Sequence, residues 1–375
     1  MMTPRERILA VYNGQKPDRV PYMLDLSHYY LHKFQLPWEL GSGYPKADTG
    51  LMDFNRKMGA AFYCPQQAHF WNVEYANDVK SSSATRVVNG VPEIYWRFDT
   101  PIGSIERIRV WEPSSYSWAI KKWGITNEKD LEVLTYAMAS RRYTPIPQNY
   151  EEWANYIGED GLVYMNTAYS AIGYLMNYWM GVENTIYASY DFEDELQECV
   201  TQINNNILEM VEMMASEFSA PVIIMGDNFS SDVQSPSFFD CWSKDYYKKA
   251  YDIIHSHGKK VAVHVDGKLK GAIKMMKDIG VDCIDAVTPG SVGGCTPAEA
   301  RAEAGNDLIL SGGIPNELWY DYSPMSSFEN AVKEWLALKD ISPALIAAAG
   351  DQVPIGALEE RILRMGELVE EYGYY

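Results

Sequence analysis

Short apolar runs alternate with longer amphipathic segments through most of this chain. Runs with the length and composition of buried strands lie at residues 20–24, 161–165, 221–225, 261–265, 283–287, 308–310 and 345–349. Most of these runs are followed by a segment with helical periodicity, and the clearest such segment covers residues 192–218. This alternation predicts parallel strands that are joined by crossover helices.

A closed ring of strands explains this pattern better than an open sheet. About eight strand–helix units, with a strand near each end of the chain, are typical of a barrel. An open sheet that binds nucleotides usually has a glycine-rich loop after its first strand, and residues 25–28 contain no glycine. We therefore predict an α/β fold of the (β/α)8 TIM-barrel class, as a single barrel domain over residues 1–375.

Residues 84–112 interrupt the strand–helix alternation. Two strand-like segments, 85–88 and 93–98, flank Asn89-Gly90, a dipeptide that favours a tight hairpin turn. A third strand is indicated at 104–111. The pattern predicts an inserted antiparallel β-meander near residues 84–112 that is too short to be a separate domain.

Composition and charge narrow the range of partners. The chain has 32 basic and 51 acidic residues and a formal net charge of −19, which argues against nucleic acid or an anionic membrane as a partner. No apolar run approaches the roughly 20 residues of a membrane span, and residues 1–15 lack the apolar region of a signal peptide. The five cysteines are scattered and form no CxxC motif, as in a reducing compartment. We expect a cytoplasmic protein.

Two polar side chains occupy the end of the apolar run at 261–265. Because side chains alternate along a strand, His264 and Asp266 point to the same side. A strand that is buried on both faces normally carries apolar residues, so this pair costs stability unless it is paired. The stretch alone leaves two interpretations open, a satisfied core pair and a functional site.

In a TIM barrel the active site lies at the carboxyl ends of the strands, so polar residues at those ends are candidates. These candidates are Asp25, His28, Asn166, Asp227, Asn228, His264, Asp266, Asp285, Asp351 and Gln352. Imidazole and carboxylates together suit a divalent metal such as zinc, and the same carboxylates suit general acid–base work. Acids at strand ends also cap the helices that follow, which is the simpler role for Asp285 and Asn228.

Several motifs spread over nearly the whole chain point to one superfamily when they are taken together. They lie at residues 3–7, 17–21, 226–228, 264–267, 280–282, 310–314 and 350–354. In combination they resemble the uroporphyrinogen decarboxylase superfamily, which includes the cobalamin-dependent methyltransferases. The resemblance implies a (β/α)8 barrel, in agreement with the strand–helix alternation.

The resemblance also distinguishes the branches of that superfamily. The decarboxylases carry an arginine-containing substrate-binding segment after the first strand, whereas residues 24–30 contain no arginine. The methyltransferases hold zinc on a His-x-Cys pair and a later Cys, and the matching positions here are His264, Asp266 and Asp351. The resemblance therefore implies a divalent metal, with zinc the first choice. Because both thiolates are replaced by carboxylates, the site would suit an ether oxygen better than a thiol.

We therefore expect an enzyme, a corrinoid-dependent methyltransferase of the O-demethylase type. It would move a methyl group from a methoxylated aromatic substrate to the cobalamin of a partner corrinoid protein, with the metal as a Lewis acid. Asp227 would be a further ligand or a general acid, and Asp25 and His28 are the other catalytic candidates.

The chain has 27 Tyr and 11 Trp, and we expect rings from residues 29–80 to close over the substrate. Three alternatives stay open at this point. One is a methylcorrinoid:thiol or folate methyltransferase, and the second is a decarboxylase of the same superfamily. The third is a non-catalytic binding barrel whose strand-end acids only cap helices.

Overall fold

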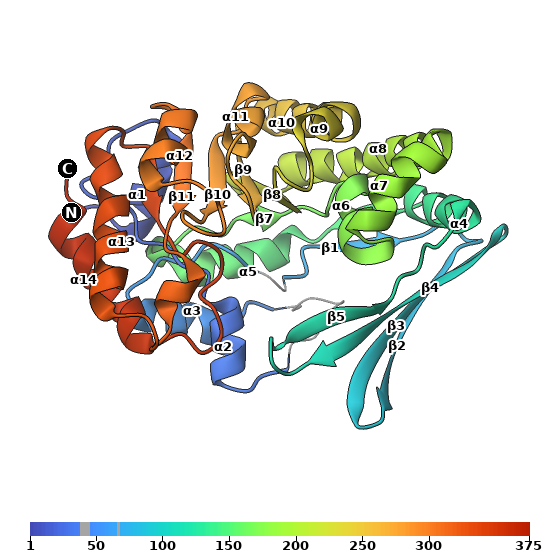
Figure 1. Cartoon of the computed structure of the whole chain (residues 1–375), viewed down its shortest axis with the longest axis horizontal. Coiled ribbons are helices and arrows are strands. Elements are labelled where there is room, and N and C mark those ends of the chain that lie inside the picture. Colours follow the sequence, from blue (N-terminus) through green and yellow to red (C-terminus); the bar gives the residue numbers. More distant parts are fainter. Residues whose placement is uncertain (38–45, 66–67) are drawn as a thin grey trace.

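The computed structural model describes residues 1–37, 46–65 and 68–375, and its centre is a parallel sheet (Figure 1). Six strands form this sheet in the order β12-β11-β10-β9-β8-β7. They are β7 (Met165–Asn166), β8 (Val222–Phe229), β9 (Lys260–Val265), β10 (Cys283–Val287), β11 (Ile309–Gly312) and β12 (Leu345–Ala347).

Two extended segments near the N-terminus close this sheet into a ring. Parallel bridges join Tyr22 to Ala347 of β12 and Met23 to Ala61. A third bridge joins Phe62 to Gly161, just before β7. The six strands and these two segments make eight, so the predicted (β/α)8 barrel is confirmed.

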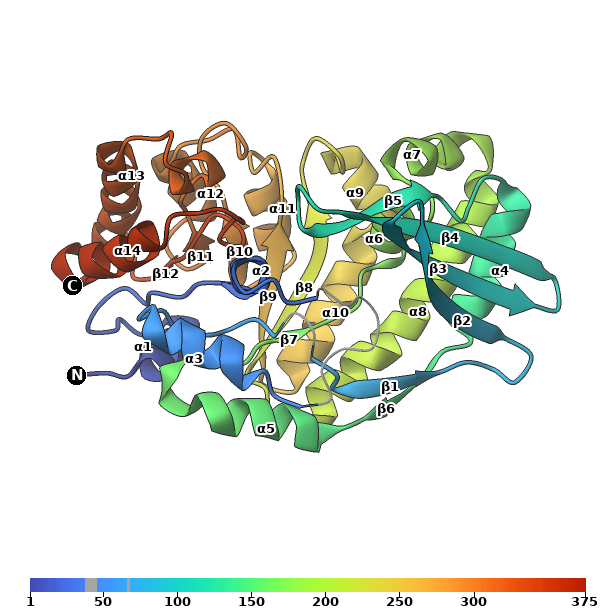
Figure 2. The same ribbon diagram turned by 90° about the horizontal axis from the view of Figure 1, so that it is seen from below.

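Helices surround the ring, and both chain ends lie close together on one side of it (Figures 1 and 2). The helices that follow the strands or cover the ends of the barrel are α1 (Pro4–Tyr12), α2 (Ser27–Lys33), α3 (Thr49–Lys57), α4 (Glu128–Ala139), α5 (Pro147–Ile157), α6 (Ala171–Tyr174), α7 (Val182–Asp191), α8 (Glu193–Glu217), α9 (Pro236–Trp242), α10 (Lys244–Ser256), α11 (Ala272–Asp278), α12 (Pro297–Ala304), α13 (Met325–Ala337) and α14 (Glu359–Tyr372). Within the described ranges, no helix has the length and apolar character that would let it cross a membrane.

The alternation of side chains along the strands creates two apolar layers. Val261, Val263 and Val265 of β9 belong to the outer layer between strands and helices. Ala262 belongs to the inner layer, which fills the barrel together with residues such as Ile224 of β8. His264 follows Ala262 by two positions and therefore points into the barrel at its carboxyl end.

The predicted insertion is present and is larger than the sequence indicated. It is a four-stranded antiparallel sheet of β2 (Lys80–Val88), β3 (Val91–Thr100), β4 (Gly103–Glu112) and β5 (Ser117–Lys122). The fourth strand, β5, is short and carries little alternation, so the sequence did not reveal it. Two further strands, β1 (Trp71–Glu74) and β6 (Arg142–Pro145), pair on either side of this insertion in the chain.

Gly161 allows the ring to close, because the neighbouring chain leaves no room for a side chain. A Cβ atom at Gly161 would lie 2.2 Å from the backbone oxygen of Phe62. We expect Gly161→Ala to lower the free energy of unfolding by about 1–3 kcal/mol, measured by urea denaturation. The control Ser83→Ala, on the exposed strand β2, should leave the midpoint unchanged. Equal midpoints for G161A and the unmodified protein would contradict the ring closure described above.

Candidate active site

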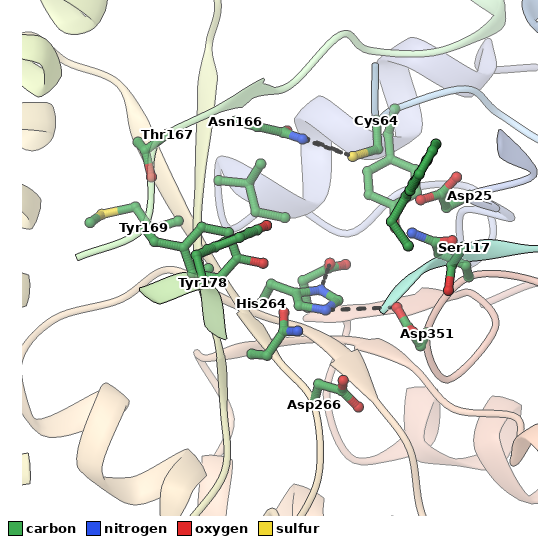
Figure 3. A pocket seen from close by; sticks show the side chains of 18 of the residues that line it. Asp25, Cys64, Ser117, Asn166, Thr167, Tyr169, Tyr178, His264, Asp266 and Asp351 are labelled. Atoms are coloured by element: carbon green, nitrogen blue, oxygen red, sulfur yellow. Dashed lines mark hydrogen bonds and ion pairs between the residues drawn. The ribbon is translucent and has the colours of Figure 1, made fainter. Parts of the chain in front are cut away.

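A cavity of about 470 Å³ opens at the carboxyl ends of the barrel strands (Figure 3). The barrel contributes polar side chains from seven of its strand ends: Asp25, Cys64, Asn166, Asn228, His264, Asp266, Asp285, Asp351 and Gln352. The structure therefore brings together most of the polar strand-end candidates. His28 and Asp227 are not among the residues that line the cavity.

His264 lies between two carboxylates. Its Nδ1 is 3.2 Å from Asp285 Oδ2, and its Nε2 is 3.7 Å from Asp351 Oδ1 (Figure 3). Burial alone would lower the pKa of His264, but the hydrogen bond to Asp285 and the charges of Asp351, Asp285 and Asp266 raise this pKa to about 9. The imidazole is thus held as a cation in the metal-free protein, which makes it a functional candidate rather than a neutral core residue.

Asp285 has a direct role in holding this histidine. The sequence made it a strand-end candidate with a helix cap as the simpler role, and the register of β9 with β10 sets Asp285 opposite His264. Its buried carboxylate accepts a hydrogen bond from the Nδ1–H group, and this leaves Nε2 facing the cavity. A carboxylate in this position fixes the ring orientation of a histidine that acts through its other nitrogen.

The three predicted metal ligands share the cavity, but they have not converged. Burial raises the pKa of Asp351, and His264 opposes that effect. Asp266 is exposed and, within the described chain, its carboxylate accepts no hydrogen bond; Figure 3 shows it apart from the pair formed by His264 and Asp351. Across the residues that the structure places, no three His, Cys, Asp or Glu side chains form a group that could hold a metal as they stand.

The chemistry of this donor set nevertheless suits a divalent cation. One imidazole nitrogen and two carboxylates face one cavity, and Asp285 already holds His264 in the orientation that a metal ligand needs. The 3.7 Å between His264 Nε2 and Asp351 Oδ1 is too long for a hydrogen bond.

Two other predicted catalytic residues, Asp25 and His28, lie at the same end of the barrel, but only Asp25 lines the cavity. Asp25 lines the cavity, and its Oδ1 accepts hydrogen bonds from the Ser27 backbone N at 2.9 Å and from Ser27 Oγ at 2.5 Å. His28 lies on α2, where its Nε2 donates to the Tyr116 carbonyl at 3.1 Å. Burial lowers the pKa of His28. Asp25 therefore faces the cavity, whereas His28 contacts the insertion through the Tyr116 carbonyl.

Asp227 does not have the position that we expected for a ligand or general acid. It points away from the cavity and accepts hydrogen bonds from Tyr247 Oη at 2.7 Å and from the Ser170 backbone N at 2.8 Å. Gly226, its neighbour on β8, faces the cavity instead, so alternation along the strand directs Asp227 outward. Burial raises the pKa of this carboxyl group. The residue joins β8 to α6 and α10.

The aromatic wall of the cavity comes mainly from parts of the chain outside residues 29–80. Tyr63 lies within that range, but Trp118, Tyr169 and Tyr178 do not. Residues 38–45 and 66–67 of the range lie outside the described residues. Trp118 comes from β5 and Tyr178 from a π-helical turn at Leu175–Trp179, neither of which the sequence pattern revealed.

Arg109 and Cys64 also line the cavity and were not predicted. Arg109 lies on β4 of the insertion, whose alternating pattern indicated a strand but not the side that faces the barrel. Cys64 Sγ lies 3.4 Å from Asn166 Nδ2, and burial raises the pKa of its thiol. Cys64 is therefore a neutral thiol rather than a reactive thiolate.

Comparison with known proteins agrees with this architecture. A family model described as "Uroporphyrinogen decarboxylase (URO-D)" matches residues 165–372, which is more than half of the chain. The chain therefore belongs to the uroporphyrinogen decarboxylase family. No curated protein sequence matches it.

Solved structures resemble the chain through their fold. A methyltransferase from Methanosarcina mazei aligns with a TM-score of 0.61 at 14% identity, over 99% of this chain and 99% of that one. At this identity the similarity shows a shared fold. A D-psicose 3-epimerase from Clostridium cellulolyticum aligns with a TM-score of 0.34 at 12% identity, over 60% of this chain and 82% of that one, which carries no argument.

Asp285 can be tested as the residue that holds the charge on His264. In the metal-free protein the folded pKa of about 9 exceeds the roughly 6.5 of an unfolded histidine. The stabilisation from His264 is therefore complete below about pH 6.5 and is lost as the pH rises through about 9. Asp285→Asn should lower the His264 pKa in an NMR titration and flatten this decline in stability. Asp240→Asn, an exposed control, should change neither; an unchanged His264 pKa in D285N would refute the assignment.

Proposed function

We propose that the protein is a methyltransferase that moves a methyl group from a methoxylated aromatic substrate to the cobalamin of a partner corrinoid protein. The observation that carries the proposal is the composition of one cavity at the catalytic end of the barrel. His264, Asp266 and Asp351 line it together with the rings of Trp118, Tyr169 and others. Its volume of about 470 Å³ is in the range of small-molecule sites.

The proposed reaction breaks the bond between the methyl carbon and the ether oxygen. The methyl group moves to the Co(I) centre of the partner's cobalamin, and the oxygen keeps the bonding electron pair and takes up a proton. The difficult part of this step is the charge that develops on the leaving oxygen. The aromatic side chains would bind and orient the ring of the substrate, and they would exclude water from it.

We further propose that His264, Asp266 and Asp351 hold a divalent metal, with zinc as the first choice. When bound, such a metal supplies a Lewis acid that polarises the ether oxygen and stabilises the leaving oxygen. Asp285 holds the His264 ring through Nδ1 and so keeps Nε2 directed into the cavity. Asp25 is the cavity carboxylate that we assign to moving the proton.

Carboxylates at positions 266 and 351 support an oxygen-containing substrate over a thiol. A thiol substrate is activated best at a metal that thiolates already hold, whereas oxygen ligands suit oxygen substrates. The cavity cysteine, Cys64, is held as a neutral thiol by burial and by the charges of nearby carboxylates, and its Sγ lies 3.4 Å from Asn166 Nδ2. These features favour ether cleavage over thiol methylation.

Methyl transfer to free cob(I)alamin tests the reaction directly. The purified protein should convert cob(I)alamin to methylcobalamin with a methoxyarene, followed by the change in the visible spectrum. Removal of a residue that holds a metal ligand in place typically lowers metal affinity or activity by about 10–100-fold. We therefore expect Asp285→Asn to lose about that much activity. His264→Asn, which removes a ligand itself, should lose at least about 100-fold. Asp240→Asn, exposed on α9, should be fully active. An active H264N variant would exclude the proposed site, and no transfer from any methoxyarene would exclude the proposed reaction.

Metal binding has its own measurement. Because the pKa of His264 is about 9 in the metal-free protein, a metal must displace a proton at pH 7. Calorimetric titration with Zn²⁺ in two buffers of different ionisation enthalpy should show about one proton released per metal, and tighter binding as the pH rises. H264N should neither bind tightly nor release this proton. Less than about half an equivalent of any transition metal, with activity that survives chelation, would exclude the Lewis-acid role.

A further inference from the structure

The cavity has an arginine at its aromatic end, and among the residues that the structure describes no acidic side chain pairs with it. Arg109 of β4 lines the cavity, and its Nη2 donates to the Trp118 carbonyl at 2.9 Å across the β4–β5 pair. Its Nε is buried without a hydrogen-bond acceptor. Over the described parts of the chain, the side chains whose charges act on Arg109 are Tyr178 and Tyr169, and no carboxylate is among them.

The surroundings of Arg109 cover the face of its guanidinium group and fill one of the donors on its edge. The group lies over the Tyr178 ring at 5.2 Å, and Tyr169 packs edge-on against the same ring at 5.0 Å. A cation–π contact of this kind uses the flat face of the group. A guanidinium has five N–H donors along its edge, and the structure fills one of them with the Trp118 carbonyl. Because Nε is buried, the donors left for a planar acceptor are those on Nη1 and the second N–H of Nη2.

A second arginine beside it increases the need for an anion. Arg107 precedes Arg109 by two positions on β4, so both side chains extend from the same face of the strand. Arg107 is enclosed by Trp96 and Trp179, with its guanidinium 4.3 Å and 4.8 Å from the ring centres. Burial, and then the charge of Arg109, lower the pKa of Arg107 to about 9. Within the described ranges, therefore, two neighbouring cations lie here with no carboxylate acting on them, in a chain with a net charge of −19.

The cavity is thus divided by charge. Asp25, Asp266, Asp285 and Asp351 gather around His264 at the strand ends, whereas Arg109 and its rings come from the insertion and from residues 169–178. Figure 3 shows Tyr169 and Tyr178 on the opposite side of the cavity from Asp25 and Asp351. A ligand that spans the cavity would place a neutral or electron-rich group near His264 and an anionic group near Arg109.

We propose that Arg109 binds a carboxylate of the substrate, so that the methyl donor is a methoxylated aromatic acid. This inference rests on the proposed function for the methyl group, although the anion site itself does not. The planar edge of a guanidinium pairs with a carboxylate through two parallel hydrogen bonds, which a lysine cannot reproduce. Tyr169, Tyr178 and Trp118 then lie beside the aromatic ring. When Arg109 holds the carboxylate, the opposite end of the ring, which carries the methoxy group, points toward His264.

Binding of a matched pair of ligands tests the anion site without any methyl transfer. 4-Methoxybenzoate and its neutral amide, 4-methoxybenzamide, have nearly the same shape and differ in charge. Isothermal titration calorimetry of the full-length protein should show at least about 10-fold tighter binding of the acid. Arg109→Gln should weaken acid binding by about 10–100-fold and leave amide binding unchanged. Arg109→Lys should recover only part of the loss.

Arg97→Gln is the matched control, because Arg97 lies on the neighbouring strand β3 and is half-exposed in an ion pair with Asp99. This variant should keep the preference for the acid. Equal affinity of the unmodified protein for acid and amide would overturn the proposal, whether or not R109Q folds. Equal weakening of both ligands in R109Q would also overturn it, since Arg109 would then only support the cavity wall.

The binding experiment tests the anion site, and the methyl-transfer assay tests the proposed reaction, so either proposal can be refuted without the other. If the acid is preferred but no methoxyarene donates its methyl group to cob(I)alamin, the anion site stands and the proposed reaction falls. If neutral methoxyarenes donate as well as the acids do, and R109Q has no effect on either, the reaction stands and the role of Arg109 falls.

Discussion

The pairing of β9 with β10 is the constraint on which the candidate site depends. This register sets His264 directly opposite Asp285, and both strands point these side chains into a closed barrel. A histidine there is costly to bury unless a carboxylate meets it. Closure of the ring brings the end of β12 to the same end of the barrel. Asp351, which follows β12, therefore lies near His264 as its second carboxylate. The polar group is therefore a product of strand register and not of one sequence motif.

Much of the fold could be predicted from the sequence because it follows from periodicity. Apolar runs separated by amphipathic segments indicated the barrel, and Asn89-Gly90 indicated the inserted hairpin. Other elements could not be recognised from the sequence alone. β5 is only partly buried and pairs with β4, so its identity as a strand depends on a partner outside its own sequence. The closing segment near Ala61 is likewise defined by its neighbours, whereas the other closing segment, at residues 20–24, was predicted from its apolar run.

The candidate site could be predicted only in part, because sequence does not show which way a fully buried strand faces. Both faces of β8 are apolar, so the pattern could not show that Gly226 faces the cavity and Asp227 faces α6 and α10. The close approach of Gly226 to His264, where a Cβ would lie 3.0 Å from the histidine Cβ, is a contact between strands. The contact of Asp285 with His264 and the position of Arg109 beside Tyr178 could not be predicted from the sequence either. Each depends on a residue that is distant in sequence.

The insertion supplies one wall of the cavity, through Arg109, Ser117 and Trp118, while the barrel strands supply the acidic group around His264. These two sets of residues lie on separate parts of the chain, and the antiparallel sheet extends from the side of the barrel (Figure 2). Substitutions in β4 and β5 can therefore reshape the ligand wall without disturbing the register that holds His264. In evolutionary terms, the choice of ligand and the reactive centre are free to diverge at different rates.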